Sequence, residues 1–505
     1  MNTLFCSPVD DFWLDVVKGL KSDSDVNAVY WLGKGKISGE LDDCFYHDEH
    51  EACNLDGGYH INPRDLPSVP LNIFSRLDYF NFLKILDRMD IEGSFSFSER
   101  DDLFKRQIEY WLYVFELRKI DFVFFSNTPH FPMQYIIYLI AKYKNVKVLM
   151  FNVSPFKGWH YLTTEVGGKS IIGSGKEHKV NIDEEFLKPF RWGTFENPWY
   201  MKEQLKKTRL SWVRKFINST LFFSFAIFFD KYLLSFLLNN KVSSFVQVIK
   251  NKFIRTKSRG VSYKIKSKSL IDFINLYSIS KKINSRNFRD FKNNSSFFDV
   301  EKEEDYVYIP LHYQPELTSC PLGGDFADQI FLIREVAKKI PKNFKIVVKE
   351  HSSQFHNGLQ GYCGRHPGYY ADIAKINNVV ICAMDTPSID LIRNCKFVVT
   401  VTGTAGWEAI VNGKVCICVG EAWYKYFPNV INAGVDDLKD KIELALSKEK
   451  FQEINGKYIN DLFLKYSIKA DLHNYFNGGI PRDAEIVKNH IAQALLQINC
   501  SYQKL

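Results

Sequence analysis

The sequence lacks several features that would assign it to other classes of protein. Its first eleven residues contain acids and a proline, without a basic segment followed by an apolar one, so we expect no secretory signal peptide. The ten cysteines are scattered along the chain, which fits a reducing cytoplasm better than a disulfide framework. No internal repeat is visible. These absences favour a cytoplasmic globular protein.

A hydrophobic run long enough to cross a membrane is also missing. The most apolar stretch, residues 216–238, is interrupted by Asp230 and Lys231, short of the ~20 apolar residues that a spanning helix needs. Its polar residues recur at about helical spacing and leave a wide apolar face.

This stretch belongs to a strongly basic block. Residues 201–300 hold 21 Lys and Arg and 5 Asp and Glu, a net charge of +16, so the rest of the chain carries −8. Two interpretations stay open: a helix that docks on the anionic inner face of the cytoplasmic membrane, or helices packed on the body of the protein with a solvated basic rim. Nucleic acid is not expected as a partner, because the aromatic residues lie within apolar runs and not between cations.

The composition predicts a globular protein with large hydrophobic cores. The chain has 505 residues, of which 46% are hydrophobic and 15% aromatic, enough for two or three domains. We expect Rossmann-like domains at residues 1–200 and 301–450, the basic and partly apolar helical linker at 201–300, and a helical tail at 451–505.

One cluster has the residue types of a metal site. Cys44, His47, His50 and Cys53 are all ligand types that zinc takes. Four ligands three residues apart cannot easily surround a tetrahedral ion without a longer loop between pairs, and the neighbouring acids favour a solvated polar segment. We therefore expect no metal.

The first half alternates strands and helices. Residues 26–32 are predicted to be the first strand, residues 121–125 and 146–151 later ones, with a helix over 133–142. This is half of a Rossmann-type unit, although it has no GxGxxG sequence. His130 lies where a strand passes into a helix, so either it lines an interdomain cleft or it caps the helix.

The most informative stretch of the second half is residues 396–420. A buried strand is followed by the turn Thr402-Gly403-Thr404-Ala405-Gly406, a short helix over 407–411 and another strand. The first N–H groups of a helix lack partners and attract anions, so this turn is a candidate phosphate site at the edge of a parallel sheet. An ordinary βαβ turn, with glycines needed only for packing, is the alternative.

A second strand end supports the phosphate interpretation. Residues 344–350 form a buried-type strand that ends in Lys349, Glu350 and His351. Residues just beyond the strand ends of a doubly wound sheet line one crevice, so these side chains should face the turn at 402–406. Further strands alternate with helices after residue 306, which predicts an α/β fold with a parallel sheet.

With these pieces, the second half resembles the capsule polysaccharide biosynthesis family of GT-B glycosyltransferases, which includes bacterial β-Kdo transferases. The resemblance covers about residues 305–430. Its motifs are His312-Tyr-Gln314-Pro-Glu316, Lys349-Glu350-His351, the run from Thr402 to Ala409, and Gly420-Glu-Ala-Trp423-Tyr424.

The resemblance implies two Rossmann-like domains, a nucleotide sugar held by the C-terminal one, a CMP-activated donor such as CMP-Kdo or a related nonulosonate, and no metal or other cofactor. It also implies a glycan or lipid-linked glycan acceptor on the N-terminal side, where His130 lies. The donor-binding residues would be Gln314, Lys349, Glu350, His351, Thr402, Gly403, Thr404, Gly406, Trp407 and Glu408, with Glu408 on the ribose or anchoring the turn.

The chain departs from the family pattern in two places. Ser352 follows His351 where the family commonly has proline, and the acidic Glu-Asp-Gly-Phe stretch of the retaining β-Kdo enzymes is not found. The sugar and the stereochemical outcome are therefore left open.

The catalytic carboxylate is chosen among acids near predicted strand ends. We predict Glu316 as the essential acid and Glu165, in the loop at residues 154–165, as the runner-up, with His351 stabilising the leaving phosphate. Two other functions stay open, a non-hydrolysing sugar-nucleotide epimerase and a non-catalytic membrane-associated assembly protein.

Overall fold

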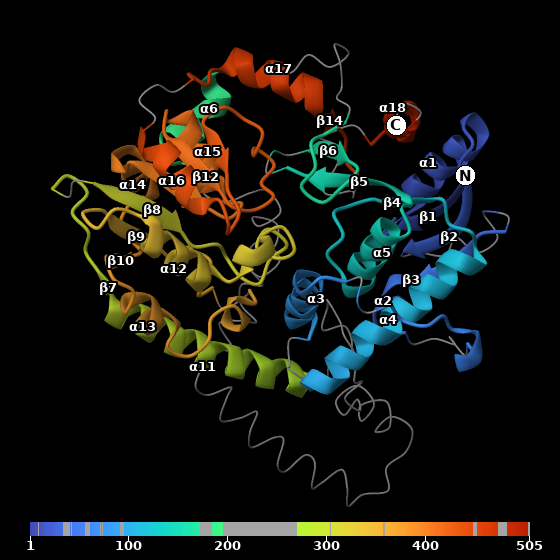
Figure 1. Ribbon diagram of the computed structural model, residues 1–505, viewed down its shortest axis with the longest axis horizontal. Helices are drawn as coiled ribbons and strands as arrows, with labels where there is room; N and C mark the ends of the chain where they lie inside the picture. The colour runs from blue at the N-terminus through green and yellow to red at the C-terminus, as the bar shows by residue number, and fades with distance from the viewer. Residues whose placement is uncertain are drawn as a thin grey trace, which may run out of the picture.

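The computed structural model contains two lobes, each built on its own sheet (Figure 1). It describes residues 1–33, 41–55, 61–90, 95–171, 184–194, 270–356, 359–447, 452–472 and 482–502, apart from residues 9, 42, 71, 73, 155, 157, 303 and 304. Residues 201–269, which hold the apolar stretch at 216–238, lie outside the described part. Within the described residues, no helix is long and apolar enough to cross a membrane.

The sheet of the N-terminal lobe has the order β14-β6-β5-β4-β1-β2-β3. Its five strands from β5 to β3 are parallel, and β6 and β14 add to the β5 edge in antiparallel pairing. The strands are β1 (Asn2–Cys6), β2 (Asn27–Gly33), β3 (Phe45–Asp48), β4 (Phe122–Phe125), β5 (Lys147–Val153), β6 (Trp159–Thr163) and β14 (Ile468–Lys469).

Helices cover both faces of this sheet because both faces of its strands are apolar. Ile85, Trp111 and Ile136 belong to one core between the sheet and the helices that follow β3 and flank β4. Trp13 and Ile491 belong to the core on the other face. The first face is covered by α2 (Glu49–Asn54), α3 (Arg76–Met89), α4 (Phe97–Leu117) and α5 (Pro132–Tyr143), and the second by α1 (Asp11–Asp23) and α18 (Ala484–Tyr502).

The sheet of the C-terminal lobe is parallel throughout, in the order β13-β12-β11-β8-β9-β10-β7. From β10 to β13 this is the 3-2-1-4-5-6 order of a doubly wound dinucleotide-type fold. The strands are β7 (Ser295–Ser296), β8 (Tyr306–Pro310), β9 (Lys345–Lys349), β10 (Val379–Cys382), β11 (Phe397–Thr400), β12 (Val415–Cys418) and β13 (Val430–Asn432).

Two further cores lie on the faces of this sheet. Val307, Ile333 and Ile346 belong to one core, and Tyr308, Trp407 and Ile410 to the other. The helices are α6 (Glu184–Arg191), α11 (Leu270–Asn294), α12 (Gln329–Lys339), α13 (Tyr369–Ala374), α14 (Ser388–Asn394), α15 (Thr404–Val411), α16 (Leu438–Ser447) and α17 (Gly456–Tyr466). The predicted architecture of two Rossmann-type sheets is confirmed.

The chain returns to its first lobe at the end. After α17, β14 pairs with β6 and α18 packs on α1, so the last described elements lie beside the N-terminus (Figure 1). The indole nitrogen of Trp13 donates to the carbonyl of Leu472 at 3.1 Å, which fixes this return. The first lobe is therefore built from both ends of the sequence.

Two predicted boundaries are corrected. The first strand is β1 and not residues 26–32, which form the second strand. Helix α15 begins at Thr404 and not at residue 407, because Gly403 takes the extended N-cap conformation at φ −69° and ψ 155°. Ser96 and Glu99 form a capping box at the start of α4.

Candidate active site

The strand order of the C-terminal sheet reverses between β8 and β11, so their carboxyl ends define its switch point. His312 follows β8 and Thr402 follows β11, and the backbone N–H of Thr402 donates to Nε2 of His312 at 2.9 Å. Burial lowers the pKa of His312 to about 3. The neutral ring can accept this hydrogen bond at physiological pH, whereas an imidazolium could not. His312 therefore positions the turn at 402–406.

The turn keeps two backbone N–H groups available for a ligand. The N–H of Gly403 donates to Oγ1 of Thr400 at 3.2 Å, and that of Gly406 donates to the carbonyl of Gly403 at 3.1 Å. No acceptor among the described residues takes the N–H of Thr404 or Ala405, the first two residues of α15. These groups, at the positive end of the helix dipole, are the ones that can bind an anion.

Gly406 is required by the packing beneath the turn. A β-carbon at this position would lie 2.3 Å from the hydroxyl oxygen of Tyr424 and 2.7 Å from Sγ of Cys416. The same hydroxyl donates to the carbonyl of Gly403, so Tyr424 holds the turn from inside the lobe. The glycine thus permits the close approach of helix α15 to β12.

His351 lies close to His312, and both rings are neutral. Burial lowers the pKa of His351 to about 4. Burial is also the largest cause of the low pKa of His312, and the nearby His351 ring is the second. The N–H of Ser353 donates to Nδ1 of His351 at 3.1 Å, so the proton of the neutral ring is on Nε2. His351 is therefore an uncharged hydrogen-bond donor near His312, the residue that holds the turn.

Glu350 and Gln314 are held by an arginine that sequence reasoning missed. Both oxygens of Glu350 accept from Arg365, at 2.8 and 3.0 Å, and both side chains of this ion pair are fully buried. Glu350 also accepts from the Tyr370 hydroxyl and the His351 N–H. Arg365 donates to Oε1 of Gln314 at 2.7 Å. These residues fix the loops around His312 and His351.

Lys349 and Glu408 come together at the same edge of the sheet. The ammonium of Lys349 donates to Oγ of Ser388 at 3.0 Å and to the carbonyl of Thr386. Burial raises the pKa of Glu408 to about 8, although nearby Lys349 lowers it. A carboxyl group with this pKa is protonated in part at neutral pH and can both donate and accept hydrogen bonds.

The Trp407 side chain is fully buried and packs against aromatic side chains of the protein. Its ring lies 6.1 Å from Phe156 and 4.9 Å from Trp423, measured between ring centroids. Phe156 belongs to the N-terminal lobe, so Trp407 and Trp423 contribute to the interface between the lobes. Trp407, which was predicted to bind the donor, is thus a buried residue of α15, the helix that follows the turn.

Glu316 lies where the two lobes meet. Its Oε2 accepts from the Thr318 hydroxyl at 2.5 Å, and burial raises its pKa, against the effects of that hydrogen bond and of Arg88 in α3. Arg88 also donates to the carbonyl of His130. The structure thus connects Glu316, through Arg88, to the backbone of His130 in the other lobe.

Glu165 is not among the residues connected to Glu316 and Arg88. It is exposed, and its neighbour Gly167 lies against Glu421 of the C-terminal lobe. The His130 ring is held by its own loop, with Nδ1 donating to the Thr128 carbonyl at 2.6 Å.

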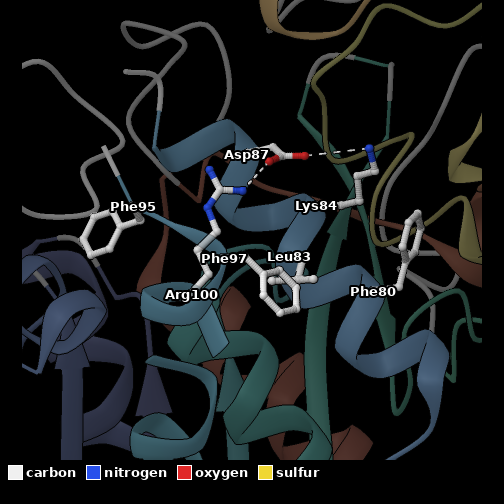
Figure 2. A pocket seen from close by; sticks show the side chains of 7 residues that line it. All are labelled: Phe80, Leu83, Lys84, Asp87, Phe95, Phe97 and Arg100. Atoms are coloured by element: carbon white, nitrogen blue, oxygen red, sulfur yellow. Dashed lines mark hydrogen bonds and ion pairs between the residues drawn. The ribbon is translucent and has the colours of Figure 1, made fainter. Parts of the chain in front are cut away.

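A separate hollow lies between α3 and α4 in the N-terminal lobe (Figure 2). Figure 2 shows Asp87 between two cations, with Arg100 at 2.6 Å and Lys84 at 3.7 Å. The other lining residues are Phe80, Leu83, Phe95 and Phe97. None of the predicted site residues lines this hollow. The described part of the chain also has no group of three or more His, Cys, Asp or Glu side chains arranged to hold a metal ion.

Residues 263–444 match the model of a family described as capsule polysaccharide biosynthesis protein. This range contains β8 to β13, the turn at 402–406, and both site histidines, so the family resemblance that the motifs indicate is confirmed for this part of the chain. No curated protein matches the sequence.

Several solved structures are similar to the chain at low identity. The UDP-GlcNAc 2-epimerase from Methanocaldococcus jannaschii is 11% identical, with a TM-score of 0.25, over 92% of this chain and 98% of that one. The β-Kdo 2,7 transferase of KpsC from Thermosulfurimonas dismutans is 11% identical, with a TM-score of 0.28, over 78% and 89%. The β-Kdo 2,4 transferase of the same protein is 14% identical, with a TM-score of 0.22, over 40% and 65%. Similarity at this level bears on neither the ligand nor the reaction.

Proposed function

We propose that this protein is a glycosyltransferase of surface polysaccharide biosynthesis, which transfers a sugar from a nucleotide donor, with a CMP-activated sugar favoured, to a glycan acceptor. The observation that carries the proposal is that the N–H groups of Thr404 and Ala405, at the switch point of the C-terminal sheet, have no acceptor among the described residues. It lies within the part of the chain that matches the capsule polysaccharide family. We infer no metal ion or other cofactor.

The donor phosphate binds to the N–H groups of Thr404 and Ala405 and to Nε2–H of His351. Each of these groups is a neutral donor that is fixed before the ligand arrives. Donors aimed at an oxygen that gains negative charge stabilise the leaving nucleotide as the sugar–oxygen bond breaks. Glu408 accepts from or donates to a ribose hydroxyl, since its carboxyl group is partly protonated near neutral pH.

Glu316 is the essential carboxylate of the proposed reaction, with Glu165 as the alternative. The raised pKa of Glu316 suits a group that exchanges a proton during turnover, and its electrostatic interaction with Arg88 of α3 supports a position near the other lobe. Exposed Glu165 lacks a comparable environment. In this assignment Glu316→Gln abolishes transfer while the protein stays folded, whereas Glu165→Gln keeps most of it.

The first experiment is calorimetric titration with CMP and UDP, followed by incubation with CMP- and UDP-sugars. Binding of CMP, and release of free CMP only when a sugar is transferred, supports the proposal. Interconversion of UDP-sugar epimers would favour an epimerase, and absence of any nucleotide binding would favour an assembly protein without turnover.

His351→Ala tests the phosphate contact within that experiment. Loss of a charge-assisted hydrogen bond costs about 1.5–3 kcal/mol, or roughly 10- to 150-fold in the Kd of CMP. His366→Ala, an exposed histidine in the same lobe, is the matched control. Equal CMP affinity in wild type and His351→Ala would remove His351 from the site.

The basic block at residues 201–300 is proposed to bring the protein to the inner face of the cytoplasmic membrane as a peripheral protein. Its charge of +16 supports this proposal.

A further inference from the structure

The N-terminal sheet has its own switch point, between β1 and β4, and the residue there is backbone-strained. Ser7 directly follows β1 and has a φ of +61°. An L-residue in this conformation costs free energy that a glycine would not, and such residues gather at functional sites. Ser7 is also partly exposed.

Residues of four elements, β2, β4, α2 and α5, hold Ser7 in place. Its N–H donates to the carbonyl of Leu32 at the end of β2, and its own carbonyl accepts from the Ser126 hydroxyl at the end of β4. The Ser7 hydroxyl donates to Oε1 of Glu49 in α2 at 3.0 Å. Gln134, in the first turn of α5, donates from Nε2 to the Ser7 oxygen and to the same Glu49 oxygen.

The orientation of Gln134 is fixed by its other end. Its Oε1 accepts the N–H groups of His130 and Phe131, at 3.1 and 3.3 Å, so Nε2 must point toward Ser7. Glu49 and Gln134 are 2% and 1% exposed, respectively, so both are buried while Ser7 is partly exposed. The Ser7 oxygen thus donates once, accepts once and retains one lone pair.

The rest of this edge has the same neutral chemistry. Thr128 donates to Oδ1 of Asn152 at 2.5 Å, Asn152 donates to the Thr163 hydroxyl at 2.6 Å, and Thr163 donates to the carbonyl of Glu165 at 2.9 Å. Hydroxyl and amide groups therefore run from β4 across β5 to β6. A buried carboxylate and neutral polar groups do not select for a phosphate, whereas they suit the hydroxyl groups of a sugar.

We propose that Ser7 is a hydroxyl-binding subsite for a neutral carbohydrate, in which the Ser7 oxygen accepts a hydrogen bond from a ligand hydroxyl. Glu49 and Gln134 are positioning residues, because they act through Ser7. The ligand is the sugar acceptor of the reaction proposed above, and the inference rests on that function. The two sheet edges then divide the substrates by chemistry, with the anion on the C-terminal edge and the polyol on the N-terminal one.

The test measures binding and does not require turnover. The full chain is titrated with methyl glycopyranosides of glucose, galactose and N-acetylglucosamine by saturation-transfer NMR, and separately with CMP by calorimetry. Ser7→Gly removes the hydroxyl and accepts the positive φ without strain. Ser447→Gly, an exposed serine at the end of α16, is the matched control.

We expect at least one glycoside to bind wild type and Ser447→Gly alike, and to bind Ser7→Gly at least tenfold more weakly, with CMP affinity unchanged. Glu49→Ala should lose glycoside affinity, and Glu49→Gln, whose amide oxygen still accepts from Ser7, should regain most of it. Equal glycoside binding in wild type and Ser7→Gly overturns the subsite. So does absence of binding by every glycoside, or a parallel loss of CMP affinity in Ser7→Gly. If CMP fails to bind wild type while glycosides bind in a Ser7-dependent way, the proposed transferase function fails and the subsite stands.

Discussion

The buried ion pair between Glu350 and Arg365 should be the most sensitive polar contact of the C-terminal lobe. Glu350 accepts four hydrogen bonds, two of them from Arg365, and neither side chain is exposed. Arg365 in turn holds Gln314 and the carbonyl of His312. Replacement of either partner alone leaves a charge inside the lobe without its counter-charge.

The magnitude follows from that burial. Removing one partner of a buried pair costs about 3–5 kcal/mol, whereas replacing both by apolar groups of similar size is often neutral. Glu350→Ala and Arg365→Ala should therefore each lower the free energy of unfolding by ~3–5 kcal/mol. The double variant Glu350→Leu with Arg365→Met should cost much less than the sum of the two single variants.

Equilibrium unfolding in urea, followed by tryptophan fluorescence, measures these differences. Lys375→Ala is the control, because its ion pair with Asp372 is exposed, at 76% and 39%, and should contribute about 0–1 kcal/mol. The reasoning is refuted if the single variants cost no more than Lys375→Ala, or if the cost of the double variant equals their sum.

Three further predictions concern Gly406 in the turn, the carboxyl group of Glu408, and the basic block at residues 201–300. Gly406→Ala should lower stability by about 1–3 kcal/mol, because its β-carbon meets the Tyr424 hydroxyl, and adding Tyr424→Phe should restore part of it in the same urea assay. Burial raises the pKa of Glu408 to about 8 in the folded chain, above the ordinary value of 4.5, so the folded state keeps a proton that the unfolded state loses. Stability should therefore fall as pH rises from 4.5 to 8, and Glu408→Gln should flatten this fall in unfolding measured across that range; an unchanged slope contradicts the assignment. Co-sedimentation with vesicles should require anionic lipid and weaken with salt because residues 201–300 carry +16, and insensitivity to both would leave the block as structural packing.

The C-terminal sheet was predictable because its strands are short, buried and rich in β-branched residues. The strand predicted at residues 344–350 corresponds to β9 within one residue, and the two strands predicted within residues 396–420 are β11 and β12. The glycine turn and the histidine after β9 were visible as residue types at strand ends. Both lie at one edge of the sheet because the carboxyl ends of parallel strands share that edge.

The parts that sequence could not give depend on distant contacts. Strand β1 has only five residues, and what makes it central is pairing with both β2 and β4. Arg365 lies in a loop with no local sequence pattern. Its structural role depends on the ion pair with Glu350, which lies fifteen residues earlier. Ser7 carries no motif, and its strain and partners exist only in the folded chain.

The return of β14 and α18 to the first lobe has a consequence for synthesis of the protein. Most of the N-terminal lobe precedes the C-terminal lobe along the chain, whereas its edge strand β14 and helix α18, which covers α1, follow the C-terminal lobe and are synthesised after it. Until α18 is synthesised, the apolar face of α1 formed by Trp13, Val17 and Leu20 cannot pack against Val487 and Ile491. Unlike domains that fold in the order of translation, this lobe reaches its final form only after the other one has been synthesised.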